Sequence, residues 1–385
     1  MTRHEKNLIN YLRASTAEVV REQLAVATIP CRTYSADKRA AYFMKALRAA
    51  GLSPKRDKIG NVLALRRGSD AASRPTLVVS AHLDSVFLHL EEIVIQRKGS
   101  VYSAPGICDD ASGIANLIVL SRALEKFKVD LPGDVLFVGS VGEESGGGVW
   151  GMEHFWKAAR LRKPWFVSID GAVPGRIVTK SLGTWSPTVT VKGPGGHSYV
   201  TFGRPNPVHM LSRIVTKLTS IKPDRSKDAT YNANMISGGT APNVIPQAAS
   251  VTLNLRSSDP RELESMKKRV MTFIDQARRE ELAWATSERW IEVAVTAHGR
   301  PGGRIAEDHD LVRFAAAAFR AERLKPEFMA SSTDANMPMS LGIPAITISA
   351  GGRAENMHSL DEWHDMKHRT KELAALGRIV FSAVG

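Results

Sequence analysis

The sequence predicts an α/β fold, with a mostly parallel β-sheet covered by helices on both faces and a smaller α+β domain inserted into it. Two observations lead to this fold class. Short β-rich runs alternate with helical segments over most of the chain, which is typical of a parallel sheet. The 385 residues also exceed one typical domain.

Five β-rich runs are expected to be buried strands of the main sheet because they are short and apolar. The expected strands are 76–84, 134–142, 164–170, 176–180 and 344–350. The segment 111–127 has helical spacing, with Ile114, Leu117, Ile118, Ser121 and Leu124 along one side, and 312–324 also reads as a helix.

The middle of the chain has a different order of elements. Alternating strands are expected at 186–195, 229–237, 249–258 and 289–299, with helices at 207–221 and 260–280. This β-α-β-β-α-β order is the ferredoxin-like pattern. We therefore expect an inserted domain at 184–298, and a main domain made of 1–183 and 299–385.

Composition excludes several classes of protein. The chain is 43% hydrophobic and 24% charged, as in ordinary globular proteins. The first residues lack a signal-peptide core, and no apolar run approaches the roughly 18 residues needed to span a membrane. A soluble cytoplasmic protein is expected. The net charge of +13 is scattered along the chain, so specific nucleic-acid binding is not expected.

Acids and histidines gather where the predicted strands end. Ligand sites in open α/β sheets form beyond the carboxyl ends of the strands. A buried cluster of carboxylates requires cations, and histidine with carboxylate ligands suits zinc, or less tightly manganese or cobalt. The residues at this expected edge are His82, Asp84, Asp109, Asp110, Glu143, Glu144, Asp170 and His358.

Several of these residues also have a structural explanation. His82 alone could be a core histidine, Asp109 could cap the helix that starts at 111, and Asp170 before Gly171 is a common turn pair. Their agreement on one predicted edge favours a site. The two cysteines form no disulfide framework, and Cys108 is expected to be a small packing residue.

Seven stretches resemble one family in order and spacing. They are SAHLDSV, APGICDDASGIANLI, GEESGGG, SIDG, VKGPGGHS, GGTAPNVIP and MHSLDEW, between about 76 and 365. They are similar to the co-catalytic dinuclear zinc metallopeptidases and amidohydrolases. This family contains peptidase T, glutamate carboxypeptidase, aminoacylases, acetylornithine deacetylase and succinyl-diaminopimelate desuccinylase. The resemblance implies a zinc-exopeptidase-like catalytic domain with an inserted lid and dimerisation domain.

The resemblance also implies the roles of individual residues. Two metal ions would be held by His82, Asp109, Glu144, Asp170 and His358, with Asp109 bridging them and His82 and Asp170 on the first ion. Asp84 would hold the other ring nitrogen of His82. Glu143 would be the general base, and the glycines after Glu144 would let both acids face inward. The peptide bond between Asp109 and Asp110 would be cis.

Further implied roles lie in the inserted domain. His197 resembles a histidine that reaches the active site of the partner subunit, which implies a homodimer; otherwise it merely ends a hairpin. Asn243 and Arg256 resemble residues that bind a substrate carboxylate, for which an arginine fork is suited. Arg256 is equally well explained as a solvated arginine at a strand end.

The expected activity is hydrolysis of peptide-like amide bonds by water that two metal ions and Glu143 activate. Aspartate at position 170 resembles peptidase T-like and dipeptidase-like members, so a di- or tripeptide aminopeptidase is favoured. The stretch GGHSYVTFGRPNP departs from the better-known members. The alternatives are an N-acyl amino acid amidohydrolase or a carboxypeptidase of the same family, and, in another class, a non-catalytic binding protein on this scaffold.

Overall fold

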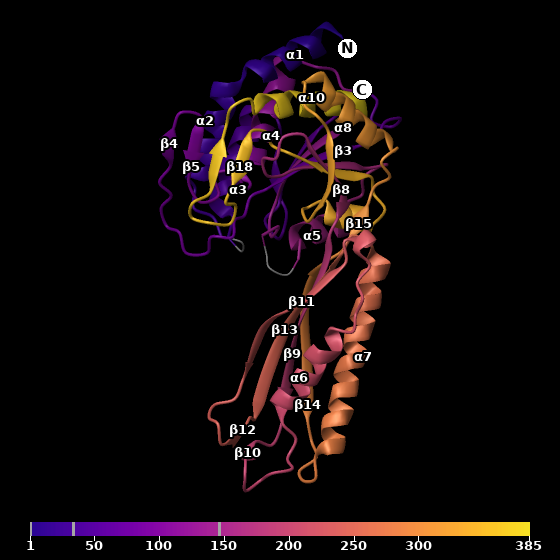
Figure 1. The fold of residues 1–385 in the computed structure, drawn as a ribbon. Helices are drawn as coiled ribbons and strands as arrows, with labels where there is room; N and C mark the ends of the chain where they lie inside the picture. The colour runs from indigo at the N-terminus through magenta and orange to yellow at the C-terminus, as the bar shows by residue number, and fades with distance from the viewer. Residues whose placement is uncertain (1, 33–34, 145–147) are drawn as a thin grey trace. The chain divides into compact units, whose positions relative to one another are not determined.

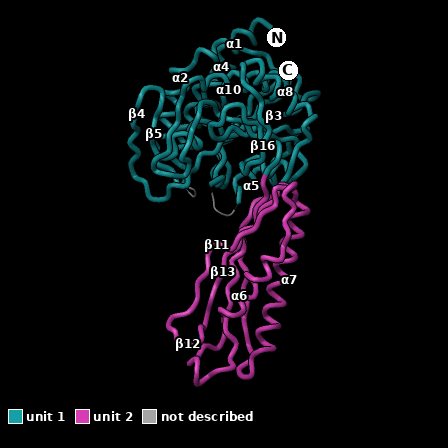
Figure 2. Tube along the Cα trace, in the orientation of Figure 1, with its two compact units in different colours: residues 1–181, 303–385 teal, residues 182–302 magenta. Residues whose placement is uncertain are grey.

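The computed structural model describes residues 2–32, 35–144 and 148–385 (Figure 1). The chain forms two compact units (Figure 2). The first contains residues 1–181 and 303–385, and the second contains residues 182–302. The insertion expected at 184–298 falls inside the second unit. None of the helices in the described ranges is both long and apolar enough to cross a membrane.

The first unit is built on a nine-stranded sheet. Its central strands β6, β3, β7 and β17 are parallel, whereas β1–β2, β2–β6, β17–β8 and β15–β8 are antiparallel pairs and β16 runs parallel to β8. The strands are β1 (Lys55–Arg56), β2 (Val62–Arg66), β3 (Leu77–His82), β6 (Val135–Ser140), β7 (Trp165–Ile169), β8 (Arg176–Ser181), β15 (Gly303–Arg304), β16 (Glu327–Ser331) and β17 (Ala345–Ile348).

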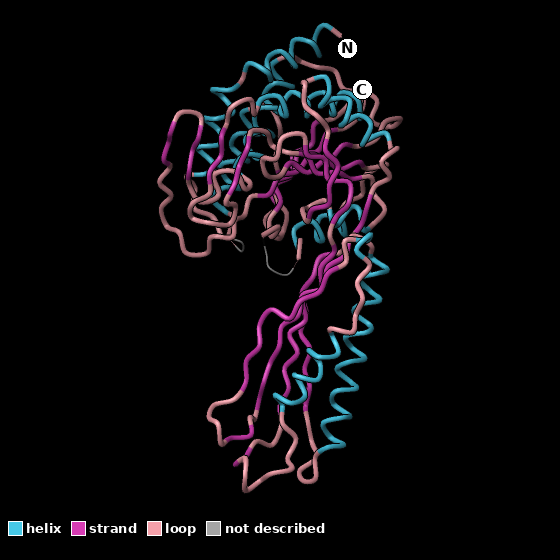
Figure 3. Tube along the Cα trace, viewed as in Figure 1, coloured by secondary structure: helices cyan, strands magenta, loops and turns pink. Residues whose placement is uncertain are grey.

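Helices cover both faces of this sheet (Figure 3). Alternate strand residues face opposite sides. Val79 and Phe137 therefore belong to the cluster that contains α4, and Val78 and Leu136 to the cluster that contains α5 and α9. The helices are α1 (Arg3–Ala14), α2 (Thr16–Ala27), α3 (Asp37–Ala49), α4 (Ala111–Lys126), α5 (Trp150–Ala158), α8 (Asp310–Ala321), α9 (Asn336–Ser340) and α10 (Thr370–Val384).

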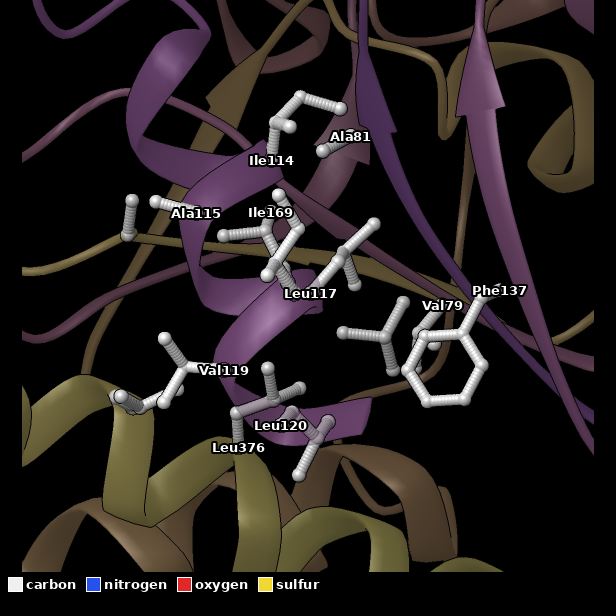
Figure 4. Packing of buried hydrophobic residues seen from close by; sticks show 14 of the residues in the cluster. Val79, Ala81, Ile114, Ala115, Leu117, Val119, Leu120, Phe137, Ile169 and Leu376 are labelled. Carbon is white, nitrogen blue, oxygen red and sulfur yellow. The ribbon is translucent and has the colours of Figure 1, made fainter. Parts of the chain in front are cut away.

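Helix α4 is the centre of the larger core. Leu117 of this helix lies toward Ile169 of the sheet, and Leu120 lies beside Leu376 of α10 (Figure 4). Each side chain is fully buried, and burial of a leucine stabilises the fold by about 1.5–3 kcal/mol. This packing holds the start of α4, and the acids just before it, against the carboxyl end of β3.

A small antiparallel sheet lies beside the main one in the first unit and was not expected from the sequence. Its order is β18 (Arg353–Glu355), β19 (Trp363–Asp365), β5 (Val101–Ser103) and β4 (Gln96–Lys98). The connection from β18 to β19, residues 356–362, carries His358. No strand was expected after 344–350, but these two short strands follow it.

The second unit contains a four-stranded antiparallel sheet with α6 and α7 packed on it, and a two-stranded sheet formed by β10 and β12. The strand order β11-β13-β9-β14 is that of a ferredoxin-like fold. Together with the first unit it confirms the predicted fold class. The elements are β9 (Gly183–Lys192), β10 (Gly196–His197), α6 (Pro207–Leu218), the 3₁₀ turn η1 (Arg225–Lys227), β11 (Thr230–Gly238), β12 (Val244–Ile245), β13 (Ala248–Ser257), α7 (Pro260–Trp284) and β14 (Glu292–Arg300).

Candidate metal centre

Three parallel strands of the main sheet end at the same edge. A histidine at the end of one strand and acids just after the strands lie at this edge. His82 is the last residue of β3 and pairs in register with Ser140 at the end of β6. Glu143 and Glu144 follow β6, and Asp170 follows β7 directly. Parallel neighbours end at the same edge, so segments distant in sequence meet there.

Asp110, not Asp109, caps helix α4. One oxygen of its carboxylate accepts the N–H of Gly113 at 2.9 Å, and the other accepts the N–H of His82 at 3.1 Å. The peptide bond between Asp109 and Asp110 is cis, as the resemblance implies. The alternative in which Asp109 serves as the helix cap is therefore wrong, and the Asp109 carboxylate is available for another role.

The Asp109 carboxylate lies between two histidine rings. His82 Nε2 is 2.8 Å from Asp109 Oδ1, and His358 Nε2 is 3.0 Å from Asp109 Oδ2. His358 Nε2 is also 3.1 Å from Glu144 Oε1. His358 has a φ of 66°, a left-handed conformation that is uncommon outside glycine. Each Asp109 oxygen thus faces a different histidine.

Ligand atoms cluster in three groups within the described ranges, each with its atoms within 4.8 Å of one another. Two of the groups match the ligand sets that the resemblance implies, and they share Asp109. The third contains Glu143, the expected base. The groups are His82, Asp109 and Asp170; Asp109, Glu144 and His358; and His82, Glu143 and Glu144.

The chemistry of these donors fits divalent cations. Imidazole nitrogens and carboxylate oxygens are the ligands of zinc and of related divalent ions. Cys108 is buried, its Sγ lies 3.6 Å from the Ser112 hydroxyl, and it belongs to none of the three groups in the described ranges. The residues present therefore suit two neighbouring ions that share one carboxylate.

The acids of this cluster perturb one another strongly. Burial and the charge of Asp109 raise the pKa of Glu144 to about 8. Hydrogen bonds to Asp109 and Glu144 raise the pKa of His358 to about 11. Burial also raises the pKa of Asp84 to about 6, although His82 opposes this shift. Because these groups favour their protonated forms so strongly, added positive charge would stabilise the cluster.

Asp84 is placed differently from the expectation. His82 Nδ1 is 3.2 Å from the main-chain oxygen of Asp84 and 3.7 Å from its carboxylate. The carboxylate instead accepts the backbone N–H groups of Glu143, at 3.3 Å, and Glu144, at 3.0 Å. Asp84 therefore joins the end of β3 to the loop that carries both glutamates.

The loop that carries both glutamates contains several glycines. The expectation that glycines after Glu144 turn the loop falls on residues 145–147, which lie outside the described ranges. Before the two acids, Gly142 has a φ of 76°, which favours glycine. A Cβ there would also meet the Trp150 ring, so this position requires glycine.

The remaining expected residues belong to the second unit. His197 ends β10, is exposed, and its Nδ1 accepts the backbone N–H groups of Tyr199, at 3.2 Å, and Val200, at 3.4 Å. The carbonyl of Asn243 accepts the N–H of Ser198 at 2.9 Å, so Asn243 and His197 are near neighbours. Arg256 lies on β13, is exposed, and donates from Nε to Asn254 Oδ1 at 2.9 Å.

Two buried acids near the site were missed in the sequence. Asp334 is 2% exposed and accepts hydrogen bonds from the hydroxyls of Ser80, at 3.3 Å, and Ser140. Burial and the nearby Glu143 raise its pKa to about 7. Its position just after β16 was the available signal, but that strand was not recognised. The second missed acid is Glu362, in the segment after His358.

The fold and this cluster of ligands define the class of protein, a hydrolase related to peptidases and amidohydrolases. Residues 78–382 match the model of Peptidase family M20/M25/M40, and the chain belongs to that family. It is therefore an enzyme, and the non-catalytic alternative is set aside. A succinyl-diaminopimelate desuccinylase of Delftia acidovorans is 27% identical over 324 residues, covering 77% of this chain and 78% of that protein.

Solved structures share the fold. Aminopeptidase PepT from Bacillus cereus superposes with a TM-score of 0.80 at 18% identity, covering 96% of this chain and 99% of that one. The YXEP protein of Bacillus subtilis, described as a dinuclear metal binding peptidase, has a TM-score of 0.68 at 14% identity, covering 96% and 99%. At these identities the likeness concerns the fold alone.

Proposed function

We propose that this chain is a dinuclear metallopeptidase that removes the amino-terminal residue from di- or tripeptides. The observation that carries the proposal is that two ligand groups share the Asp109 carboxylate. His82, Asp109 and Asp170 would hold one ion, and Asp109, Glu144 and His358 the other. Zinc is the favoured metal for this donor set, with manganese or cobalt as alternatives.

Ions held there would polarise the scissile carbonyl and supply a water acidic enough to lose a proton near neutral pH. Glu143 would accept that proton and return it to the leaving amine, since it lies beside both groups without being needed to complete either. The Asp84 carboxylate would keep Glu143 and Glu144 in place through their backbone N–H groups.

The second unit would supply the contacts to the substrate. Because His197 Nδ1 accepts two backbone N–H groups, the ring proton of a neutral His197 lies on Nε2. That N–H would donate to the developing oxyanion in the partner subunit of a homodimer. Asn243 and Arg256 would bind the substrate carboxylate. The cytoplasmic location stays a prediction from the sequence.

A second function is favoured by a separate observation. A curated relative that covers 77% of this chain is a desuccinylase, which removes an acyl group rather than an amino acid. An N-acyl amino acid amidohydrolase is therefore the alternative. The fold likeness to PepT and the aspartate at position 170 favour the peptidase.

The choice between them can be tested with substrates. The purified enzyme would be loaded in turn with zinc, manganese and cobalt and offered di- and tripeptides beside N-acetyl and N-succinyl amino acids. We expect a higher kcat/KM for unblocked peptides. Efficient hydrolysis of an N-acyl amino acid, with little activity on peptides, would establish the alternative instead.

A further inference from the structure

Glu362 accepts four hydrogen bonds from backbone N–H groups of residues 104–109. Its side chain has no solvent exposure. Oε1 accepts the N–H groups of Cys108, at 2.8 Å, and Asp109, at 3.1 Å, and Oε2 accepts that of Gly106 at 2.9 Å. Its main-chain carbonyl accepts the N–H of Ala104 at 3.0 Å.

The same glutamate terminates the turn that carries His358. Within 356–362, the N–H of Ser359 donates to the carbonyl of Asn356 at 3.1 Å, and the N–H of Glu362 donates to the carbonyl of Ser359 at 3.2 Å. The Ser359 hydroxyl accepts the N–H of Asp361 at 3.0 Å. These hydrogen bonds join the short turn, in which His358 has a left-handed conformation, to Glu362.

These contacts connect two proposed ligands that are far apart in the sequence. Asp109 and Glu362 are separated by 253 positions, and the Asp109 N–H is held directly by the Glu362 carboxylate. His358, four positions before Glu362, meets the Asp109 carboxylate at 3.0 Å. Glu362 therefore fixes the distance between the ligand atoms of Asp109 and His358.

We propose that Glu362 is a positioning residue for the metal ion held by Asp109, Glu144 and His358. The inference rests on the proposed dinuclear function and assigns to that site a residue that touches neither ion nor substrate. A carboxylate is needed because it accepts at both oxygens. The side-chain amide of glutamine has an oxygen at one position and an NH₂ group at the other. In Glu362→Gln this NH₂ group would therefore face a backbone N–H in either orientation of the amide.

The test compares Glu362→Gln with a matched control, Glu322→Gln. Glu322 is also buried and also accepts three hydrogen bonds, from Arg13 Nε and Nη2 and from Arg378 Nε at 2.6–2.9 Å. Its partners lie on α1 and α10, which carry none of the proposed ligands. Glu362→Asp serves as a second variant, because it keeps the charge but shortens the reach.

The readout is stepwise zinc binding to the metal-free protein against a competing chelator, with the melting temperature as a check of folding. We expect Glu362→Gln to weaken the binding of one ion on the order of 10- to 100-fold, as for other residues that support metal ligands. The site affected should be the one that His358→Ala removes. Glu322→Gln should lower the melting temperature and leave both affinities unchanged.

Other outcomes separate two failures. If the wild-type protein binds two ions and the folded Glu362 variants bind both with wild-type affinity, Glu362 is only a loop anchor and the positioning role is wrong. If Glu322→Gln weakens zinc binding as much as Glu362→Gln does, the effect is general destabilisation and the role is again wrong. If the wild-type protein itself does not bind two ions, the proposed function fails first.

Discussion

The Asp84 carboxylate accepts the backbone N–H of Glu144 at 3.0 Å and so joins the end of β3 to the loop after β6. The same carboxylate holds the N–H of Glu143 at 3.3 Å. Because both glutamates are held through their main chains, their side chains can serve different tasks. One is expected to serve as base and the other as ligand.

This division of tasks predicts different results for two isosteric changes. Glu143→Gln keeps the shape of the side chain but cannot accept a proton. We therefore expect kcat to fall by about 10²- to 10⁴-fold or more while both metals stay bound. Glu144→Gln should instead lower the occupancy of one metal position, since a carboxylate contact is replaced by an amide. Kinetics with metal analysis on each purified variant checks this.

The opposite pattern would reverse the roles. Glu143 is close enough to His82 and Glu144 to form a ligand group of its own. Loss of a metal from Glu143→Gln, with both metals kept in Glu144→Gln, would make Glu143 the ligand.

The shared carboxylate predicts an effect on both ions at once. Asp109→Asn should weaken the binding of both, because a neutral amide offers one oxygen where two are needed. Loss of a helix cap cannot explain such a result, because Asp110 is the cap of α4. Metal content after dialysis is the measurement.

A matched control is available in the second unit. Asp259 caps α7 through the N–H groups of Arg261 and Glu262. Asp259→Ala should reduce stability by about 0.5–2 kcal/mol without changing metal content. Normal binding of both ions by Asp109→Asn would exclude the bridging role.

The pKa shifts predict how stability and metal binding depend on pH. The pKa values of Glu144, Asp84 and His358 are raised, to about 8, 6 and 11. Protonation of each of these three groups therefore stabilises the folded metal-free protein. This stabilisation is fully present below the group's unfolded-state pKa and is lost as pH rises through its folded-state pKa. The pKa of Asp109 is lowered, so its contribution is already complete above about pH 4.

The metal-free protein should accordingly lose stability between pH 5 and 8. Ions replace the protons on these groups, so metal affinity should rise over the same range. The melting temperature with zinc minus that with chelator should be larger at pH 8 than at pH 5. A difference that stays constant or shrinks would contradict the assignment of these groups to the metal site.

The proposed role of His197 in the partner subunit predicts complementation. Glu143→Ala and His197→Ala proteins should each be inactive, and mixing them should restore activity through hybrid dimers with one complete site. Random exchange in a twofold dimer would restore about a quarter of the wild-type activity. Each variant incubated alone is the control. No recovery despite demonstrated subunit exchange would rule out action across the dimer.

The sequence was most informative where strands were buried on both faces. β3, β6 and β7 are continuous apolar runs, so their ends could be located, and His82, Glu143 and Asp170 followed from them. The ferredoxin-like order of the second unit was equally clear, because strand alternation and helical spacing changed sharply along the chain.

Other parts of the site were beyond the reach of sequence patterns. Asp109 was weighed as the cap of α4, and only the path of the backbone shows that Asp110 caps this helix instead. The short strand β16 is partly exposed, which weakened its pattern and concealed Asp334. Glu362 lies in an irregular turn and acts on a segment 253 positions away, a contact that no local spacing predicts.

Hydrolysis by this enzyme should depend on two metal ions, and metal removal tests this dependence most directly. The purified enzyme would be dialysed against a strong chelator until its metal content is nil, and then titrated with zinc or manganese. We predict that hydrolysis of a peptide substrate disappears and returns as two equivalents per chain are restored. Undiminished turnover by protein with verified nil metal would contradict this claim.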